Sequence, residues 1–235
     1  MNMFLWHSRK KKAPPRPDEF WLSQGNFRDY EAIPGFVGYY GVPSFFYEEP
    51  ILKQTENEEK FHRVARSTIK CLLEGKPSVI LIKDLSHGGA NLWIDKIPEI
   101  REMALSEGGK LLEVHDARCK QYLFVFDVLT DSFFEMIYQL INRDCRYQNI
   151  YITYSALANG IQKGADIASI KETVLLNLHI DDDHPIFIIQ AVPEYPLEKI
   201  SEALSTACHS EGWTFHTLCC GESQNGGHGC EAGNH

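Results

Sequence analysis

The densest set of residues that could bind a metal lies at the C-terminal end of the chain. Six histidines and cysteines fall within the last twenty residues: His216, Cys219, Cys220, His228, Cys230 and His235. Thiolate and imidazole are ligands that zinc prefers, and the interleaved glycines would let the backbone fold closely around an ion. Cys219, His228, Cys230 and His235 are therefore candidate zinc ligands. Their spacing matches no zinc-finger or zinc-ribbon pattern, so a disordered polar tail over residues 219–235 is the alternative.

A second candidate site depends on the order of the strands. His87 follows one predicted strand, and His115, Asp116 and Cys119 lie at the end of the next. If those two strands run parallel with a third between them, their ends lie about 10 Å apart at one edge of the sheet. Side chains reaching inward could then hold zinc or iron, and a metal with an open position could activate water. His87, His115 and Asp116 are thus candidate catalytic residues, and unrelated loop residues at a polar turn are the alternative.

Two further patterns have ordinary interpretations. Asp181-Asp182-Asp183-His184 clusters carboxylates that could bind a divalent cation, but it lacks the spacing of an EF-hand loop. We interpret it as a soluble hairpin tip. Ser86-His87-Gly88-Gly89 could present backbone amides to an anion, although two adjacent glycines also simply make a flexible turn.

The remaining cysteines and the known signatures add no reactive site. Cys71 and Cys208 stand at apolar helical positions, so we expect them to fill the core. The chain has no P-loop, Gly-x-Gly-x-x-Gly, Gly-x-Ser-x-Gly or His-Glu-x-x-His motif. The sequence therefore disfavours a P-loop kinase, a dinucleotide-binding Rossmann domain, a lipase and a zincin protease.

The elements that would position these residues follow a clear order. Helices are predicted from a capping box at Thr55 to Gly75, from about residue 97 to the glycines at 108–109, after Thr130 or Asp131, and from Pro196 to about Ala207. Strands are predicted at 78–82, 110–115, 122–128, 149–154, 172–180, 185–192 and 213–218. Residues 78–154 therefore read β, α, β, β, α, β, the order of a ferredoxin-like split βαβ core. The ββαβ group that follows either extends that sheet or forms a second one, and the fold class is α+β.

Composition divides the chain into three parts. Residues 1–17 combine a basic run with three prolines and are expected to be a disordered leader. Residues 18–218 should form a single α+β domain, with 55–155 and 172–218 as possible subdomains. Within it, the aromatic-rich segment 18–50 shows no sustained period, so we expect it to wrap the domain or to form an exposed binding surface.

Charge and cysteine usage point to a cytoplasmic protein. The formal net charge is −9, and the basic leader leaves 18 basic against 32 acidic residues in the rest of the chain. Such a surface makes nucleic acid an unlikely partner and favours a basic protein. Seven scattered cysteines do not form a secreted disulfide framework, and no apolar run is long enough to span a membrane.

Two functions of different classes remain. The first is a non-catalytic intracellular interaction protein, an inhibitor or adaptor, that binds a protein partner through an acidic, aromatic-rich surface. The second is a metal-dependent hydrolase that uses the His/Asp/Cys site, with zinc as the expected cofactor.

Overall fold

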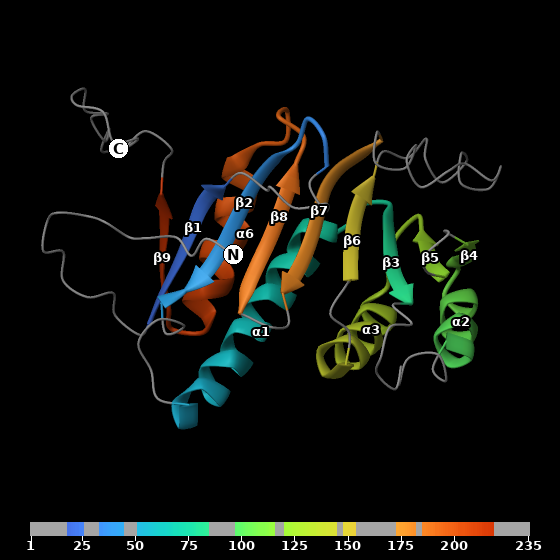
Figure 1. Ribbon diagram of the computed structural model, residues 1–235, viewed down its shortest axis with the longest axis horizontal. Coiled ribbons are helices and arrows are strands. Elements are labelled where there is room, and N and C mark those ends of the chain that lie inside the picture. The colour runs from blue at the N-terminus through green and yellow to red at the C-terminus, as the bar shows by residue number, and fades with distance from the viewer. Residues whose placement is uncertain are drawn as a thin grey trace, which may run out of the picture.

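The computed structural model describes residues 18–25, 33–44, 51–84, 97–115, 120–144, 148–153, 173–181 and 185–218. These residues contain four helices and nine strands, and the strands form one mixed sheet (Figure 1). The α+β class predicted from the sequence is confirmed. Within the described residues no helix is both long and apolar enough to cross a membrane.

The strands lie in the order β4-β5-β3-β6-β7-β8-β2-β1-β9. Every neighbouring pair is antiparallel except β1 and β9, which are parallel. The strands are β1 (Glu19–Gly25), β2 (Val37–Pro43), β3 (Ser78–Asp84), β4 (Lys110–His115), β5 (Lys120–Phe126), β6 (Gln148–Thr153), β7 (Val174–Asp181), β8 (Ile186–Ala191) and β9 (Thr214–Leu218). The helices are α1 (Ile51–Leu73), α2 (Ile97–Ser106), α3 (Asp131–Asp144) and α6 (Leu197–Ser210).

The group of elements after residue 172 extends the first sheet. β6 pairs with β7 and β7 pairs with β8, so the sheet continues past β6 without a break. Strands β3 to β6 have the order β4-β5-β3-β6 with antiparallel neighbours. The comparison with a ferredoxin-like core stays an interpretation, because these four strands are only part of a larger sheet. The division into domains or subdomains likewise stays a prediction.

The expectation that residues 18–50 lack regular structure is wrong for the part that the structure describes. β1 and β2 form an antiparallel hairpin that lies between β8 and β9. Phe20 and Leu22 alternate toward the core and are 0% and 1% exposed. The aromatic ring of Trp21 on the opposite side of β1 hides this alternation in the sequence, because both faces of the strand then look apolar.

Helix α1 begins one turn earlier than predicted. It starts at Ile51, so Thr55 lies inside the helix and is not its N-cap. Leu52, Lys53 and Gln54 are good helix formers, and they extend the helix beyond the capping-box pattern. Its end is as predicted: Gly75 has a φ of +65°, and the Lys76 backbone N–H donates to the Leu73 carbonyl over 2.9 Å.

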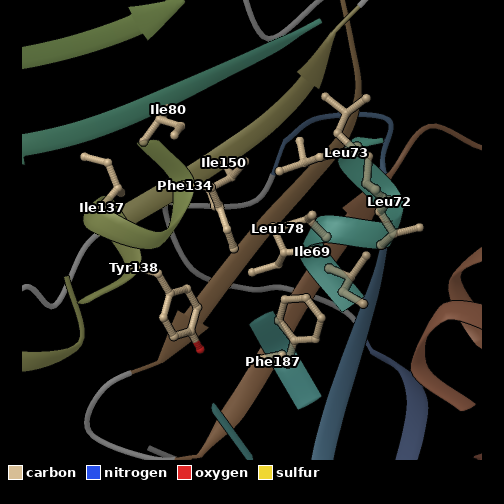
Figure 2. Packing of buried hydrophobic residues seen from close by; sticks show 14 of the residues in the cluster. Ile69, Leu72, Leu73, Ile80, Phe134, Ile137, Tyr138, Ile150, Leu178 and Phe187 are labelled. Atoms are coloured by element: carbon tan, nitrogen blue, oxygen red, sulfur yellow. The ribbon is translucent and has the colours of Figure 1, made fainter. Parts of the chain in front are cut away.

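All four helices pack on one face of the sheet. Their buried side chains form a single cluster with core residues of β1, β3, β5, β6, β7 and β8. Figure 2 shows Ile69 and Leu72 of α1 near Phe187, and Phe134 of α3 near Ile150. Ile80 and Phe124, which the sequence placed in adjacent buried strands, are direct partners across β3 and β5 and are both 0% exposed.

A smaller cluster covers part of the opposite face. Ile33 packs there with buried residues of β3, β5, β6 and β7, and Phe36 lies against the same group. The Ile33 backbone N–H donates to Oε1 of Gln190 over 2.8 Å, and the Gln190 amide donates to Oδ1 of Asn177 over 3.4 Å. The bond between Ile33 and Gln190 spans 157 residues of sequence and fixes the chain before β2 on the sheet.

Charged side chains join α1 to α3. Glu135 accepts contacts from Arg66 at 3.1 Å and from Lys70 at 2.5 Å, and Lys70 also lies 3.7 Å from Asp131. Burial alone would raise the pKa of Glu135, but the Lys70 hydrogen bond and the charges of Arg66 and Lys70 together hold it below its usual value. These side chains are about one-third exposed except for that of Asp131, so the network fixes the helix orientation more than it adds stability.

Candidate functional site

The predicted zinc ligands lie outside the described residues. Cys219, His228, Cys230 and His235 all follow Leu218, the last residue described. Among the residues that the structure does describe, no group of three or more His, Cys, Asp or Glu side chains is placed to hold a metal ion. The zinc site at the C-terminal end therefore stays a prediction.

The hypothetical catalytic site is described only at its supporting strands. Lys120, the first residue of β5, pairs with His115 at the end of β4 on one side and with Asp84 at the end of β3 on the other. The C-terminal ends of β3 and β4 therefore lie on the same side of the sheet, one on each side of the start of β5. His87, Asp116 and Cys119 lie outside the described residues, as do residues 182–184 of the acidic turn, so this metal site also stays a prediction.

The two helical cysteines differ. Cys208 is fully buried, as predicted, and burial raises the pKa of its thiol to about 12. Cys71 is exposed, and its assignment to the core is wrong. The buried face of α1 runs through Phe61, Val64, Thr68 and Leu72, and Cys71 lies just beyond its border.

The best described candidate surface is on the side of β8, β2, β1 and β9 that faces away from the helices. Register and strand alternation place its members on this side, because their neighbours Phe20, Leu22 and Phe187 point into the core. Most of its apolar side chains are half-buried, and Leu218 is 38% exposed. We call this surface the aromatic face, and it consists of Trp21, Tyr40, Val42, Ile186, Ile188, His216 and Leu218.

Trp21 and His216 lie on β1 and β9, at the end of the aromatic face that is nearest the edge of the sheet. Their rings stack with centroids 4.2 Å apart and an interplanar angle of 18°. Nε2 of His216 lies 3.7 Å from Oε1 of Glu19, and it is buried without a hydrogen-bond partner. The half-buried stacked rings thus lie beside a carboxylate, a combination that can accept an apolar side chain next to a positive charge.

No family model, curated protein or solved structure matches this chain. The function must therefore be inferred from the geometry of the described residues.

A cavity of about 410 Å³ lies between the end of α1 and the start of α3. Its lining combines apolar groups with a few polar ones: Lys70, Cys71, Leu73, Glu74, Gly75, Val128, Leu129, Thr130, Asp131 and Phe134. The Lys70 ammonium group is already held by Glu135 and Asp131. The cation that would make this cavity an anion site is therefore neutralised within the protein, and we do not place the function there.

Sequence reasoning found only part of the aromatic face. It indicated a binding surface in the segment 18–50, which supplies Trp21, Tyr40 and Val42. It counted His216 in the dense set of histidines and cysteines but gave it no role, and the structure stacks that ring on Trp21. Ile186 and Ile188 belong to a predicted strand, and only the position of β8 beside β2 shows that they continue the same surface.

Proposed function

We propose that this chain is a non-catalytic interaction protein that binds a protein partner through the aromatic face. The observation that carries the proposal is a continuous row of half-buried aromatic and aliphatic side chains across four neighbouring strands. Aromatic residues are enriched in protein interfaces because they bury a large area at a low cost in side-chain entropy. The alternative, a metal-dependent hydrolase, stays a prediction.

Charge supports a basic partner. The chain has a formal net charge of −9, and Glu19, the first residue of β1, lies beside the aromatic face. A partner with lysine or arginine next to an apolar anchor would be attracted to this surface over a distance of about one Debye length. The same negative charge disfavours self-association of the protein and its binding to nucleic acid.

The test compares two matched substitutions of exposed leucines. Leu218→Glu places a charge in the aromatic face, whereas Leu105→Glu does the same on α2, where the leucine is 53% exposed. Proteins retained by immobilised wild type would be identified, purified and measured again as binary complexes. We expect the true partner to lose affinity about tenfold or more with Leu218→Glu and to be unaffected by Leu105→Glu.

A basic partner should also bind more weakly as salt is raised from about 0.05 to 0.3 M. Equal affinity of the wild type and the Leu218→Glu variant for every purified candidate would contradict the proposal.

A further inference from the structure

β9 is the outermost described strand at one end of the sheet, and it differs from the strand at the other end. β9 reads Thr-Phe-His-Thr-Leu and contains no lysine, arginine, acid, glycine or proline. β4, at the opposite end, carries exposed Lys110 and Glu113. Charged side chains on an edge strand are a common protection against pairing with another chain. β4 has that protection and β9 does not.

The hydrogen-bonding groups on the outer side of β9 can be assigned. The Thr214 backbone N–H donates to the Asp18 carbonyl over 2.8 Å, so the backbone of Thr214 faces β1. Successive residues of a strand point their N–H and C=O groups to opposite sides. The backbone groups of Phe215 and Thr217 therefore point away from β1, and no other described strand pairs with them.

The surroundings of this edge have a definite chemistry. On one side lies the aromatic face, with His216 and Leu218 on β9 itself. On the other side α6 packs against β9. Asp18 and Glu19 lie on the neighbouring strand. A strand placed next to β9 would find apolar contacts on one of its faces and carboxylates nearby.

We infer that β9 accepts an extended, basic segment of the protein partner as a tenth strand. Main-chain hydrogen bonds from Phe215 and Thr217 provide the attachment, and alternate side chains of the segment contact the aromatic face. Its lysine or arginine side chains complement Asp18 and Glu19 at the start of β1. The inference rests on the proposed function and adds the mode of binding and the chemistry of the bound segment.

The key substitution is Thr217→Pro. Proline removes the outward N–H of residue 217 and leaves the bonds from β9 to β1 in place, because those come from residues 214, 216 and 218. Thr217→Val is the matched control, since it keeps the N–H and the β-branched shape. Thermal unfolding shows whether each variant retains the wild-type fold.

The probe is a synthetic eight-residue peptide of alternating valine and lysine, with a valine–glutamate peptide as its charge control. We expect the valine–lysine peptide to bind wild type and Thr217→Val equally. Its affinity should fall about tenfold or more with Thr217→Pro, and the valine–glutamate peptide should bind wild type about tenfold more weakly than the lysine peptide.

Hydrogen exchange gives a second measurement that needs no variant. Bound peptide should slow exchange of the Phe215 and Thr217 amides in the wild-type protein by about tenfold or more. Unchanged exchange of both amides at saturating peptide would overturn strand addition, even if Thr217→Pro failed to fold.

The outcomes separate this inference from the proposed function. If Leu218→Glu abolishes peptide binding but Thr217→Pro does not, the aromatic face binds the peptide without adding a strand, and the inference is wrong. If neither substitution weakens binding, both proposals are wrong. A concentration-dependent dimer of the protein alone that Thr217→Pro dissociates would show that a second copy occupies the edge, which would also overturn the basic segment as the occupant.

Discussion

Two histidines lie against aromatic rings, and their charged neighbours differ. His216 stacks on Trp21 beside the Glu19 carboxylate. Nδ1 of His62 lies 3.3 Å from the hydroxyl oxygen of Tyr138, and the positive charge of Arg66 acts on the His62 ring. Burial, and then the positive charge of Arg66, lower the pKa of His62. A proton on His62 is therefore unfavourable in the folded protein.

The lowered pKa of His62 makes the stability of the folded protein depend on pH. Because the folded pKa of His62 is below its unfolded value, near 6.5, the unfolded chain binds the proton more readily. Stability should be highest above about pH 6.5 and should decrease as the pH falls below it. His62→Asn should flatten this part of the curve in urea unfolding measured between about pH 5 and 8. The exposed His209→Asn is the control, and identical slopes for wild type and His62→Asn would contradict the prediction.

The core also contains a position where a single substitution tests the strand assignment. Phe124 of β5 is 0% exposed and pairs with Ile80 of β3. Its ring centroid lies 5.7 Å from that of Phe133. Phe124→Ala should lower the free energy of unfolding by about 3 to 5 kcal/mol through lost burial and an unfilled cavity. Val128→Ala, at a site that is 58% exposed, should change it by less than about 0.5 kcal/mol. Equal denaturation midpoints for the two variants would refute the packing.

At the scale of elements, regular hydrophobic patterns predicted most of the structure. The stripe through Phe133, Phe134 and Ile137 gave α3, and the apolar run at 78–82 gave β3. Glycine concealed β2. Gly41 suggests a turn in the sequence, but a Cβ there would come within 2.9 Å of the Phe20 ring, so the glycine makes room for a core side chain.

Gly25 in β1 has a similar role on the opposite side of the sheet. A side chain there would collide with the ring of Tyr40, which packs across the glycine backbone from the neighbouring strand. Such aromatic packing over a strand glycine depends on a cross-strand partner, and the local sequence does not reveal that partner. The aromatic face could be only partly predicted for the same reason: its members come from four strands that are distant in the sequence.

Gly75, at the end of α1, is required for its backbone conformation and not to make room for a side chain. Gly75 has a φ of +65°, and a Cβ there would meet no atom within 4 Å. Any cost of Gly75→Ala therefore comes from backbone conformation, and we expect a loss of about 1 to 2 kcal/mol in the free energy of unfolding. Gly75→Asn should lose less, because asparagine tolerates this conformation better. Chemical denaturation of the three proteins measures the order, and an alanine variant as stable as wild type would contradict the assigned cap.

At the scale of the whole molecule, the first and last described strands are neighbours. β1 lies between β2 and β9, and its Phe20 stacks with Phe61 of α1 and with Trp213 just before β9. The N-terminal hairpin thus connects β9 to the rest of the sheet. Without β1, β9 would lose its described sheet partner. Helix α6 would then pack on a strand that has no backbone hydrogen bonds to the rest of the described sheet.

Two N-terminal deletions test this role. Removal of residues 1–17 should leave the thermal midpoint nearly unchanged, because that segment combines three prolines with a basic run. Removal of residues 1–25 also deletes β1 and should abolish cooperative unfolding or lower the midpoint strongly. Thermal denaturation followed by circular dichroism distinguishes the two, and a large effect of the shorter deletion would show that the leader packs on the domain.

The position of β1 and β2 also affects how the protein can fold during its synthesis. Both strands leave the ribosome before the other described strands, yet the outer neighbours of their hairpin, β8 and β9, begin at Ile186 and Thr214. At about 5 to 20 residues per second, those partners are synthesised roughly 7 to 35 seconds after the hairpin. During that time Phe20 and Leu22 have no completed sheet to join. We expect the nascent chain to bind chaperones that recognise short apolar segments until β9 has joined the sheet.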